Sequence, residues 1–177
     1  MMTKPRMRIG VIGHLDYQLA DRLENAGHSV EWRVPWEAVA EFDCLLLAVS
    51  AEDLPDVVAR LRGRVRQRQI VIHTCVELGA RALRELGGVA IALHPIDDLC
   101  AVGAEDELSE TVATLLVQEM ELRPVMVPEG DRVALGAALR KVVEVKQSLA
   151  NLEASFESDG AYALFVAARN STTWGYY

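Results

Sequence analysis

Apolar and amphipathic segments alternate along the first 127 residues of the chain. Residues 44–49 and 70–72 form continuous apolar runs, which are typical of strands buried on both faces of a parallel sheet. The pattern predicts strands at 8–12, 29–34, 43–49, 69–73, 89–93 and 124–127, and helices at 16–26, 36–41, 53–62, 77–86 and 107–120. This alternation predicts an α/β fold with a doubly wound parallel sheet, whose strands end at one common, ligand-binding edge.

The connection between the second and third strands is too short for a complete crossover. Fewer than about ten residues separate Val34 from Asp43, whereas a crossover with its helix takes at least about 10–12 residues. We therefore expect a sheet that is shortened after its second strand and keeps only a short helical turn at 36–39.

The pattern changes after Pro128, where a long run without proline extends to Ser158. Seven apolar residues in this run are spaced alternately by three and four positions, as in a heptad seam. They are Leu135, Ala138, Val142, Val145, Leu149, Leu152 and Phe156. This pattern predicts a domain at 1–128 and a C-terminal helical segment at 129–177, with a second helix at 161–169. We expect the seam to form a homodimer, and the alternative is a helix packed on its own domain.

Composition and charge narrow the possible partners. The net charge is −8 and the isoelectric point is about 5.0, so the chain lacks the basic surface that nucleic acids require. No segment reaches the ~20 apolar residues that a membrane span needs. The three cysteines are an odd number and far apart, which favours a reducing, cytoplasmic location.

The first predicted strand, turn and helix form an altered dinucleotide-binding motif. In G-x-G-x-x-G, the glycines make the turn, admit the pyrophosphate to the backbone, and pack the helix on the strand. Here the corresponding residues are Gly13, Leu15 and Gln18. Asp16 adds a carboxylate at the helix start; it caps the helix and repels a pyrophosphate. This motif predicts a degenerate turn with impaired dinucleotide binding.

Four short segments, in this order, carry a resemblance to one superfamily. They are Ala-Gly-His-Ser-Val at 26–30, Leu-Leu-Ala-Val-Ser at 46–50, Val-Ile-His-Thr-Cys at 71–75, and Ala-Ile-Ala-Leu-His-Pro-Ile at 90–96. Together they resemble the NAD(P)-binding domain of the 6-phosphogluconate-dehydrogenase-like superfamily, and most closely its uncharacterised Rossmann-like members. The resemblance covers about residues 8–127. The helical segment takes the place of that superfamily's C-terminal helical, usually dimerising, domain.

The resemblance implies a reductase that moves hydride between a nicotinamide cofactor and a small substrate. It implies that Gly10, Gly13 and His14, in the turn, face the pyrophosphate. Val49 and Ser50 would lie beside the nicotinamide.

The cofactor that the second strand favours is NADP. The end of this strand carries Val34 or Pro35 at the position where dinucleotide-binding folds have an acidic residue that binds the ribose. Neither side chain can hold a 2′-hydroxyl. Arg33 is close by and suits a 2′-phosphate, although a solvated surface arginine is the alternative.

Two histidines follow buried strands at the ligand edge. His73 and His94 are the candidate catalytic residues, because histidine exchanges protons near neutral pH. The alternative is that both rings bond to neighbouring backbone. The resemblance implies that Thr74 and Cys75 edge the substrate cleft. The spacing of these side chains fits no zinc pattern, so we expect no metal.

The sequence leaves two hypotheses for function. The first is an NAD(P)-dependent reductase-like protein of unknown substrate with a degenerate dinucleotide-binding turn. The second is a non-enzymatic ligand-binding or regulatory module that has lost cofactor binding. We expect a small molecule at the carboxyl-terminal edge of the sheet, and in the second hypothesis the altered turn accepts a different ligand or none.

Overall fold

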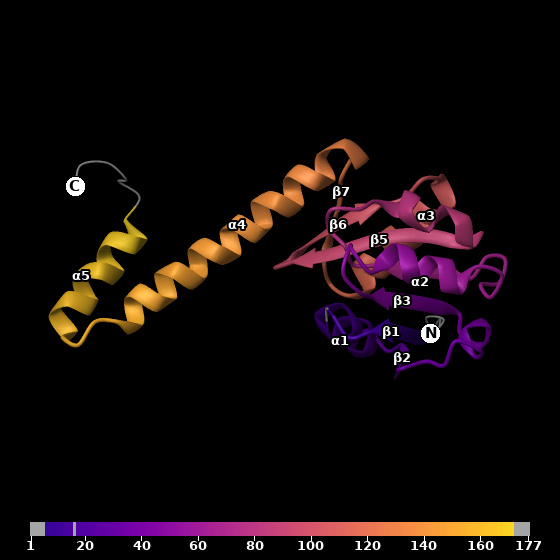
Figure 1. Ribbon diagram of the computed structural model, residues 1–177, viewed down its shortest axis with the longest axis horizontal. Coiled ribbons are helices and arrows are strands. Elements are labelled where there is room, and N and C mark those ends of the chain that lie inside the picture. Colours follow the sequence, from indigo (N-terminus) through magenta and orange to yellow (C-terminus); the bar gives the residue numbers. More distant parts are fainter. Residues whose placement is uncertain (1–5, 16, 172–177) are drawn as a thin grey trace. The chain divides into compact units, whose positions relative to one another are not determined.

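The computed structural model describes residues 6–15 and 17–171 (Figure 1). The strands are β1 (Arg8–Gly13), β2 (Ser29–Trp32), β3 (Cys44–Ala48), β4 (Ile70–His73), β5 (Val89–Ile96), β6 (Leu99–Gly103) and β7 (Arg123–Met126). The α-helices are α1 (Tyr17–Asn25), α2 (Leu54–Leu61), α3 (Glu107–Glu119), α4 (Glu129–Ala154) and α5 (Asp159–Asn170). Two 3-10 helices, η1 (Val39–Glu41) and η2 (Ala80–Leu86), complete the elements. The chain separates into two compact units, Met1–Gly136 and Ala137–Tyr177.

The first unit is built on one seven-stranded sheet with the order β2-β1-β3-β4-β5-β6-β7. Strands β2 and β3 pair in parallel with opposite sides of β1, so the direction of winding reverses at β1. In the described chain, β2 is the last strand on its side, and η1 alone lies between β2 and β3. The predicted α/β doubly wound sheet, shortened after its second strand, is confirmed.

One edge of the sheet departs from the wholly parallel arrangement that we predicted. Strand β6 was not predicted; it pairs antiparallel with β5, and β7 is parallel to β6. Asp97 and Asp98 connect β5 to β6. Asp97 adopts φ 57°, a left-handed conformation that aspartate tolerates in tight turns. This turn reverses the chain and makes the sheet mixed.

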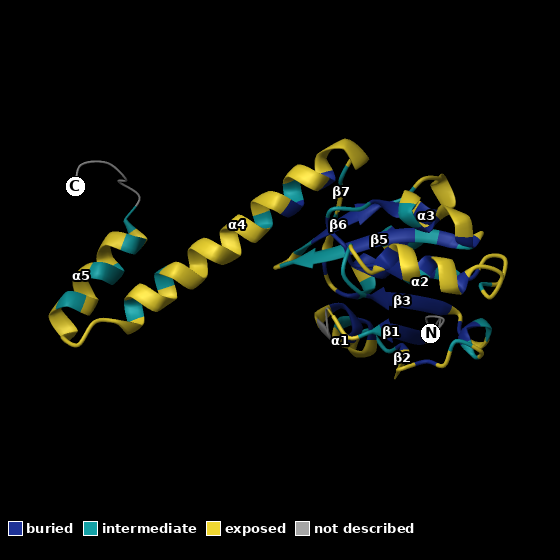
Figure 2. Cartoon of the chain, in the orientation of Figure 1, coloured by how far each residue is buried: buried dark blue, intermediate teal, exposed yellow. Residues whose placement is uncertain are grey.

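Two apolar layers cover the two faces of the sheet. Alternate residues of β3 point to opposite faces: Leu46 packs with α1 and α3, whereas Leu45 and Leu47 pack with η1, α2 and η2. All five β3 residues are buried, which explains why this strand is continuously apolar. The central strands are accordingly the most deeply buried part of the unit (Figure 2).

The helices differ from the predicted segments in type and length. The segment at 36–41 contains only η1, and the segment at 77–86 contains η2 rather than an α-helix. Gly87 ends η2 with φ 71°, the left-handed conformation that glycine adopts without strain. The segment between His73 and Ala80 is not helical and runs from the end of β4 to η2.

Helix α4 begins in the first unit, where Arg132 and Gly136 are buried. It ends at Ala154, four residues before the predicted end, and Ser158 then caps α5 by accepting a hydrogen bond from Ala161 N at 3.2 Å. Several seam residues of the second unit are exposed, including Val142 and Val145 (Figure 2). Among the described residues, no helix is long and apolar enough to cross a membrane.

Candidate functional site

A cavity of 460 Å³ lies at the carboxyl-terminal edge of the sheet. Its walls come from the turn after β1 and from the ends of β3, β4 and β5. This is where ligands bind in doubly wound sheets. Of the predicted site residues, it brings together Val49, Ser50, Thr74, Cys75 and His94. We refer to this cavity as the edge cleft.

The turn after β1 is closed by the carbonyl group of Ala48. The backbone amides of His14 and Leu15 both donate to Ala48 O, at 3.0 and 2.9 Å. Gly13 adopts φ 96°, and a Cβ added there would lie 2.2 Å from the same oxygen. Phosphates at helix starts bind free backbone N–H groups. Two amides of this turn already donate to Ala48 O, so they are not free to bind a phosphate in this structure.

Two side chains stand where the motif requires glycine. Leu15 is 41% exposed, and it lines the edge cleft together with Gln18. Both residues therefore line the cleft at positions where the motif has glycine. Asp16, whose carboxylate we expected to repel that group, lies outside the described residues.

Gly10 has a packing role in the structure. It lies in the middle of β1, paired with Glu31 and Leu45, and away from the turn. A Cβ at this position would lie 2.9 Å from the ring of Phe42 and from Val34. Gly10 is therefore small because the core leaves no room, and it does not line the edge cleft.

Arg33 directly follows β2 and is exposed. Its φ is 59°, an uncommon conformation for a residue other than glycine, asparagine or aspartate. Since Trp32 pairs with Val11, Arg33 lies at the level of the end of β1 but does not line the edge cleft. This position is compatible with a contact to a phosphate outside the cleft.

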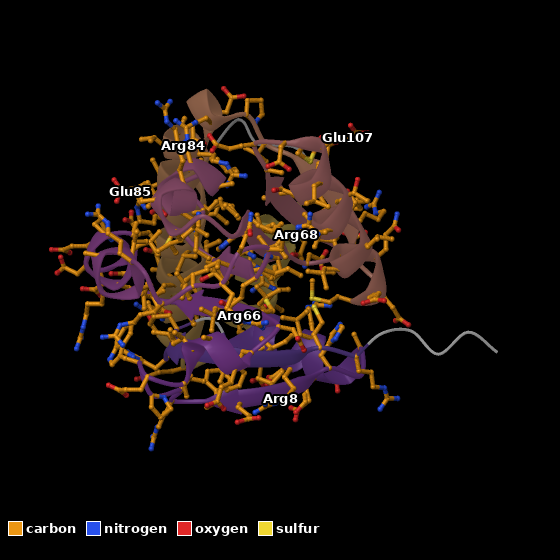
Figure 3. All side chains as sticks on the ribbon, turned by 90° about the vertical axis from the view of Figure 1, so that its right-hand side faces the viewer. Arg8, Arg66, Arg68, Arg84, Glu85 and Glu107 are labelled. Atoms are coloured by element: carbon orange, nitrogen blue, oxygen red, sulfur yellow. The ribbon has the colours of Figure 1, made fainter. Side chains whose placement is uncertain are left out.

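The charges around the edge cleft do not favour a polyanion. Among the described residues that line it, Glu77 is the single charged side chain. Arginines lie instead at the amino-terminal ends of the strands, opposite the edge cleft. Arg8 begins β1 there, and the loop before β4 carries Arg66 and Arg68 (Figure 3). A diphosphate in the cleft would meet a carboxylate and no cation from the described lining.

His73 is fully buried, and both of its ring nitrogens are hydrogen-bonded. Nε2 lies 2.9 Å from Gly79 O and donates to it, because a carbonyl can only accept. Nδ1 then accepts from Cys75 N at 3.2 Å. Burial, together with the nearby charge of Arg132, lowers the pKa of His73 to about 4. The ring is therefore neutral at pH 7, and it fixes the path of the 73–79 loop.

His94 differs from His73 because it lies partly exposed in the wall of the edge cleft. Its Nδ1 lies 2.8 Å from Thr74 O and donates to that carbonyl. In the neutral ring this bond leaves Nε2 as the acceptor. His73 is therefore a buried residue that positions the loop, whereas His94 lines the cleft and presents a hydrogen-bond acceptor.

Two further polar residues of the cleft, Ser50 and Cys75, are held by local hydrogen bonds. Cys75 Sγ donates to Val49 O at 3.2 Å, and burial, followed by the charge of Glu77, raises the pKa of Cys75 to about 12. Its thiol is therefore a packed structural group rather than a nucleophile. Ser50 Oγ donates to Asp53 at 2.7 Å and accepts from Asp53 N at 3.1 Å, which anchors the start of α2. Across the described ranges, no cluster of three or more histidine, cysteine or acidic residues suits a metal ion.

Sequence reasoning missed the groups that organise this site through the backbone. The Ala48 carbonyl closes the turn, and no side-chain pattern signals a backbone acceptor. Arg132 donates to Leu78 O at 3.0 Å and thereby holds the loop that lines the cleft. A lone arginine in the first turn of a long helix would have been the one available signal.

Comparison with known proteins identifies the fold. No protein-family model and no curated protein matches the sequence. The structure is similar to a protein from Bacteroides fragilis assigned as an NADP oxidoreductase, with a TM-score of 0.69 and 11% identity over 82% of this chain and 70% of that chain. A protein from Jannaschia sp. CCS1 assigned as an oxidoreductase gives a TM-score of 0.67 and 12% identity, over 94% of this chain and 82% of that chain.

A third similar structure is the pyrroline carboxylate reductase of Plasmodium falciparum with NADP bound. Its TM-score is 0.60 and its identity is 13%, over 94% of this chain and 80% of that chain. Identities this low show a shared fold and leave activity open. The protein therefore has the Rossmann-like α/β fold found in NAD(P)-dependent oxidoreductases.

Proposed function

We propose that this protein is an NAD(P)-dependent reductase-like protein of the 6-phosphogluconate-dehydrogenase-like superfamily, with a degenerate turn that weakens dinucleotide binding. The observation that carries the proposal is the edge cleft, which lies at the point where the sheet reverses its winding. The similar structures support the same class, because they include NADP oxidoreductases. A cytoplasmic location is part of the same proposal.

The proposed ligand of the edge cleft is a small molecule with a hydrogen-bond donor. His94 Nε2 is the acceptor for it, because Nδ1 is bonded to Thr74 O. Thr74 and Cys75 shape the wall beside this ring. His73 acts by positioning the loop and has no free ring atom for a ligand.

NADP is the favoured cofactor over NAD. The support is Arg33, which is exposed and lies beside the end of β1. A guanidinium suits a 2′-phosphate, and Val34 and Pro35, which follow Arg33, carry no carboxylate to hold a ribose hydroxyl.

A homodimer through the second unit belongs to the same proposal. Val142, Val145 and Leu152 are 48%, 49% and 52% exposed along the predicted seam. A repeated apolar seam on a helix is the pattern of a helix–helix interface.

Titration with NADPH and NADH, followed by fluorescence and by the melting temperature, tests the proposal. A ligand at 100 times its Kd stabilises by about 2.7 kcal/mol. We expect weak, saturable binding of NADPH that Arg33→Gln reduces, with NADH binding unaffected by that change. If neither nucleotide at millimolar concentration shifts the melt, the reductase-like assignment is wrong.

The second candidate is a ligand-binding or regulatory module without a dinucleotide. The specific observation in its favour is the bonding of the His14 and Leu15 amides to Ala48 O. This candidate predicts that a small molecule stabilises the edge cleft while both nucleotides fail to do so.

A further inference from the structure

A second cavity, of 380 Å³, lies in the first unit, away from the edge cleft. Its walls come from η2, from the chain after β6 and β7, and from the first turn of α4. Arg81, Gly103, Glu129 and Arg132 are among its lining residues, and none of the residues that line it lines the edge cleft. We refer to it as the arginine cavity.

Arg132 stands in the wall with part of its hydrogen-bonding capacity unused. The residue is 1% exposed. Its Nε donates to Val127 O at 3.3 Å, and its Nη1 donates to Leu78 O at 3.0 Å. Nη2 is buried and has no hydrogen-bond partner in the described structure. An unpaired donor on a buried cation is costly, so the position favours an added acceptor.

The unused nitrogen lies against Gly103, another residue of the cavity wall. A Cβ added at Gly103 would lie 2.6 Å from Nη2 and 3.1 Å from Cζ of Arg132. The absence of a side chain at this position therefore makes the space that the guanidinium occupies. A methyl group added at Gly103 would therefore displace the guanidinium of Arg132 without removing it.

The balance of charge around the arginine cavity limits the charge that a ligand can carry. Glu129 Oε1 accepts from Gly79 N at 3.2 Å, and Glu105 is held by Arg84 at 2.7 Å. The lining arginines, Arg81 and Arg132, are balanced by the carboxylates of Glu105 and Glu129, and Arg84 pairs with Glu105 from outside the lining. A wall with this near-neutral balance accommodates a monoanion better than a phosphate dianion.

The remaining wall residues indicate that the uncharged part of the ligand is apolar. Ala80, Met126, Val127 and Pro128 give it apolar surface. Cavities of roughly 300–1,000 Å³ hold small organic ligands. Arginine forms its strongest hydrogen bonds with carboxylates and phosphates. We propose that the arginine cavity binds a small monocarboxylate, whose carboxylate accepts from Arg132 Nη2 and whose apolar body packs on this wall.

Sodium butyrate is a suitable probe, and butyramide is its neutral counterpart. We measure the melting temperature and isothermal heats at constant ionic strength, with sodium chloride and inorganic phosphate as further arms. The expected result is a saturable rise in melting temperature with butyrate alone. An equal rise with butyramide would overturn the proposal, because binding would then need no charge. An equal effect of phosphate would overturn the monocarboxylate assignment.

Two variants tie the effect to the guanidinium. Gly103→Ala should weaken butyrate binding at least tenfold, because its methyl group displaces Nη2. Arg132→Gln should abolish binding, and Gly103→Ala keeps the test decisive if that variant fails to fold. The control is Arg64→Gln, an exposed arginine with the same loss of charge, and it should bind like wild type. Unchanged binding in Gly103→Ala would contradict the site. No cofactor is present, so the outcome is independent of the proposed reductase-like function.

Discussion

The buried state of His73 makes the stability of this protein sensitive to mild acid. The ring is fully buried, and its pKa is lowered from 6.5 to about 4. The unfolded chain therefore binds a proton between these two values while the folded chain does not. Stability is complete above the unfolded pKa and falls as pH decreases through this window. One pKa unit corresponds to about 1.36 kcal/mol, so the total loss below pH 4 is about 3 kcal/mol.

Most of this loss should appear before the folded protein itself takes up the proton. Between pH 7 and pH 5 the linkage relation gives a loss of about 2 kcal/mol from His73 alone. His73→Gln removes the titration and keeps a side-chain donor that can reach for Gly79 O. The difference between wild type and this variant in free energy of unfolding isolates the contribution of His73 from that of other groups.

Urea unfolding followed by circular dichroism at pH 7, 6 and 5 gives this difference. The control is His14→Gln, which changes an exposed histidine of the turn and should keep the wild-type dependence on pH. If wild type and His73→Gln lose stability in parallel, His73 is not buried in its neutral form. The assignment of a positioning role would then be wrong.

Two further predictions concern the core and the dimer. Gly10→Ala should destabilise the fold by about 1–3 kcal/mol, because its methyl group meets the ring of Phe42. The control Gly130→Ala adds a methyl group in open space and should not destabilise the fold. Thermal unfolding of the two variants measures the difference. Val145→Asp should convert a dimer to a monomer in size-exclusion chromatography with light scattering, since a charge enters the seam. Val143→Asp changes an exposed valine outside the seam and should leave the dimer intact; equal effects of both would contradict a seam interface.

The sequence predicted the parts of the fold that depend on burial. Strands β3 and β4 are buried on both faces, so their apolar runs identify them without ambiguity. The short spacing before Asp43 correctly indicated the lost outer strand. Strand β6 escaped because its pairing depends on the turn at Asp97, whose left-handed backbone leaves no hydrophobic signal.

The candidate site was predictable in its location but not in its chemistry. The strand ends placed His73 and His94 at one edge of the sheet. The role of each histidine, however, depends on the backbone groups that its ring contacts, and the sequence does not show these contacts. His73 bonds to Gly79 O and Cys75 N, whereas His94 bonds to Thr74 O and lines the cleft. Such contacts depend on how far each strand extends, which residue type alone does not determine.

The central claim is that the turn after β1 resists a pyrophosphate. The most direct measurement is the Kd of NADPH for the wild-type protein and for the double variant Leu15→Gly/Gln18→Gly, by isothermal titration calorimetry. Our account predicts a wild-type Kd of about 0.1–1 mM, which corresponds to about −5.5 to −4 kcal/mol of binding free energy, and at least tenfold tighter binding by the variant. Micromolar binding by the wild-type protein would contradict the account.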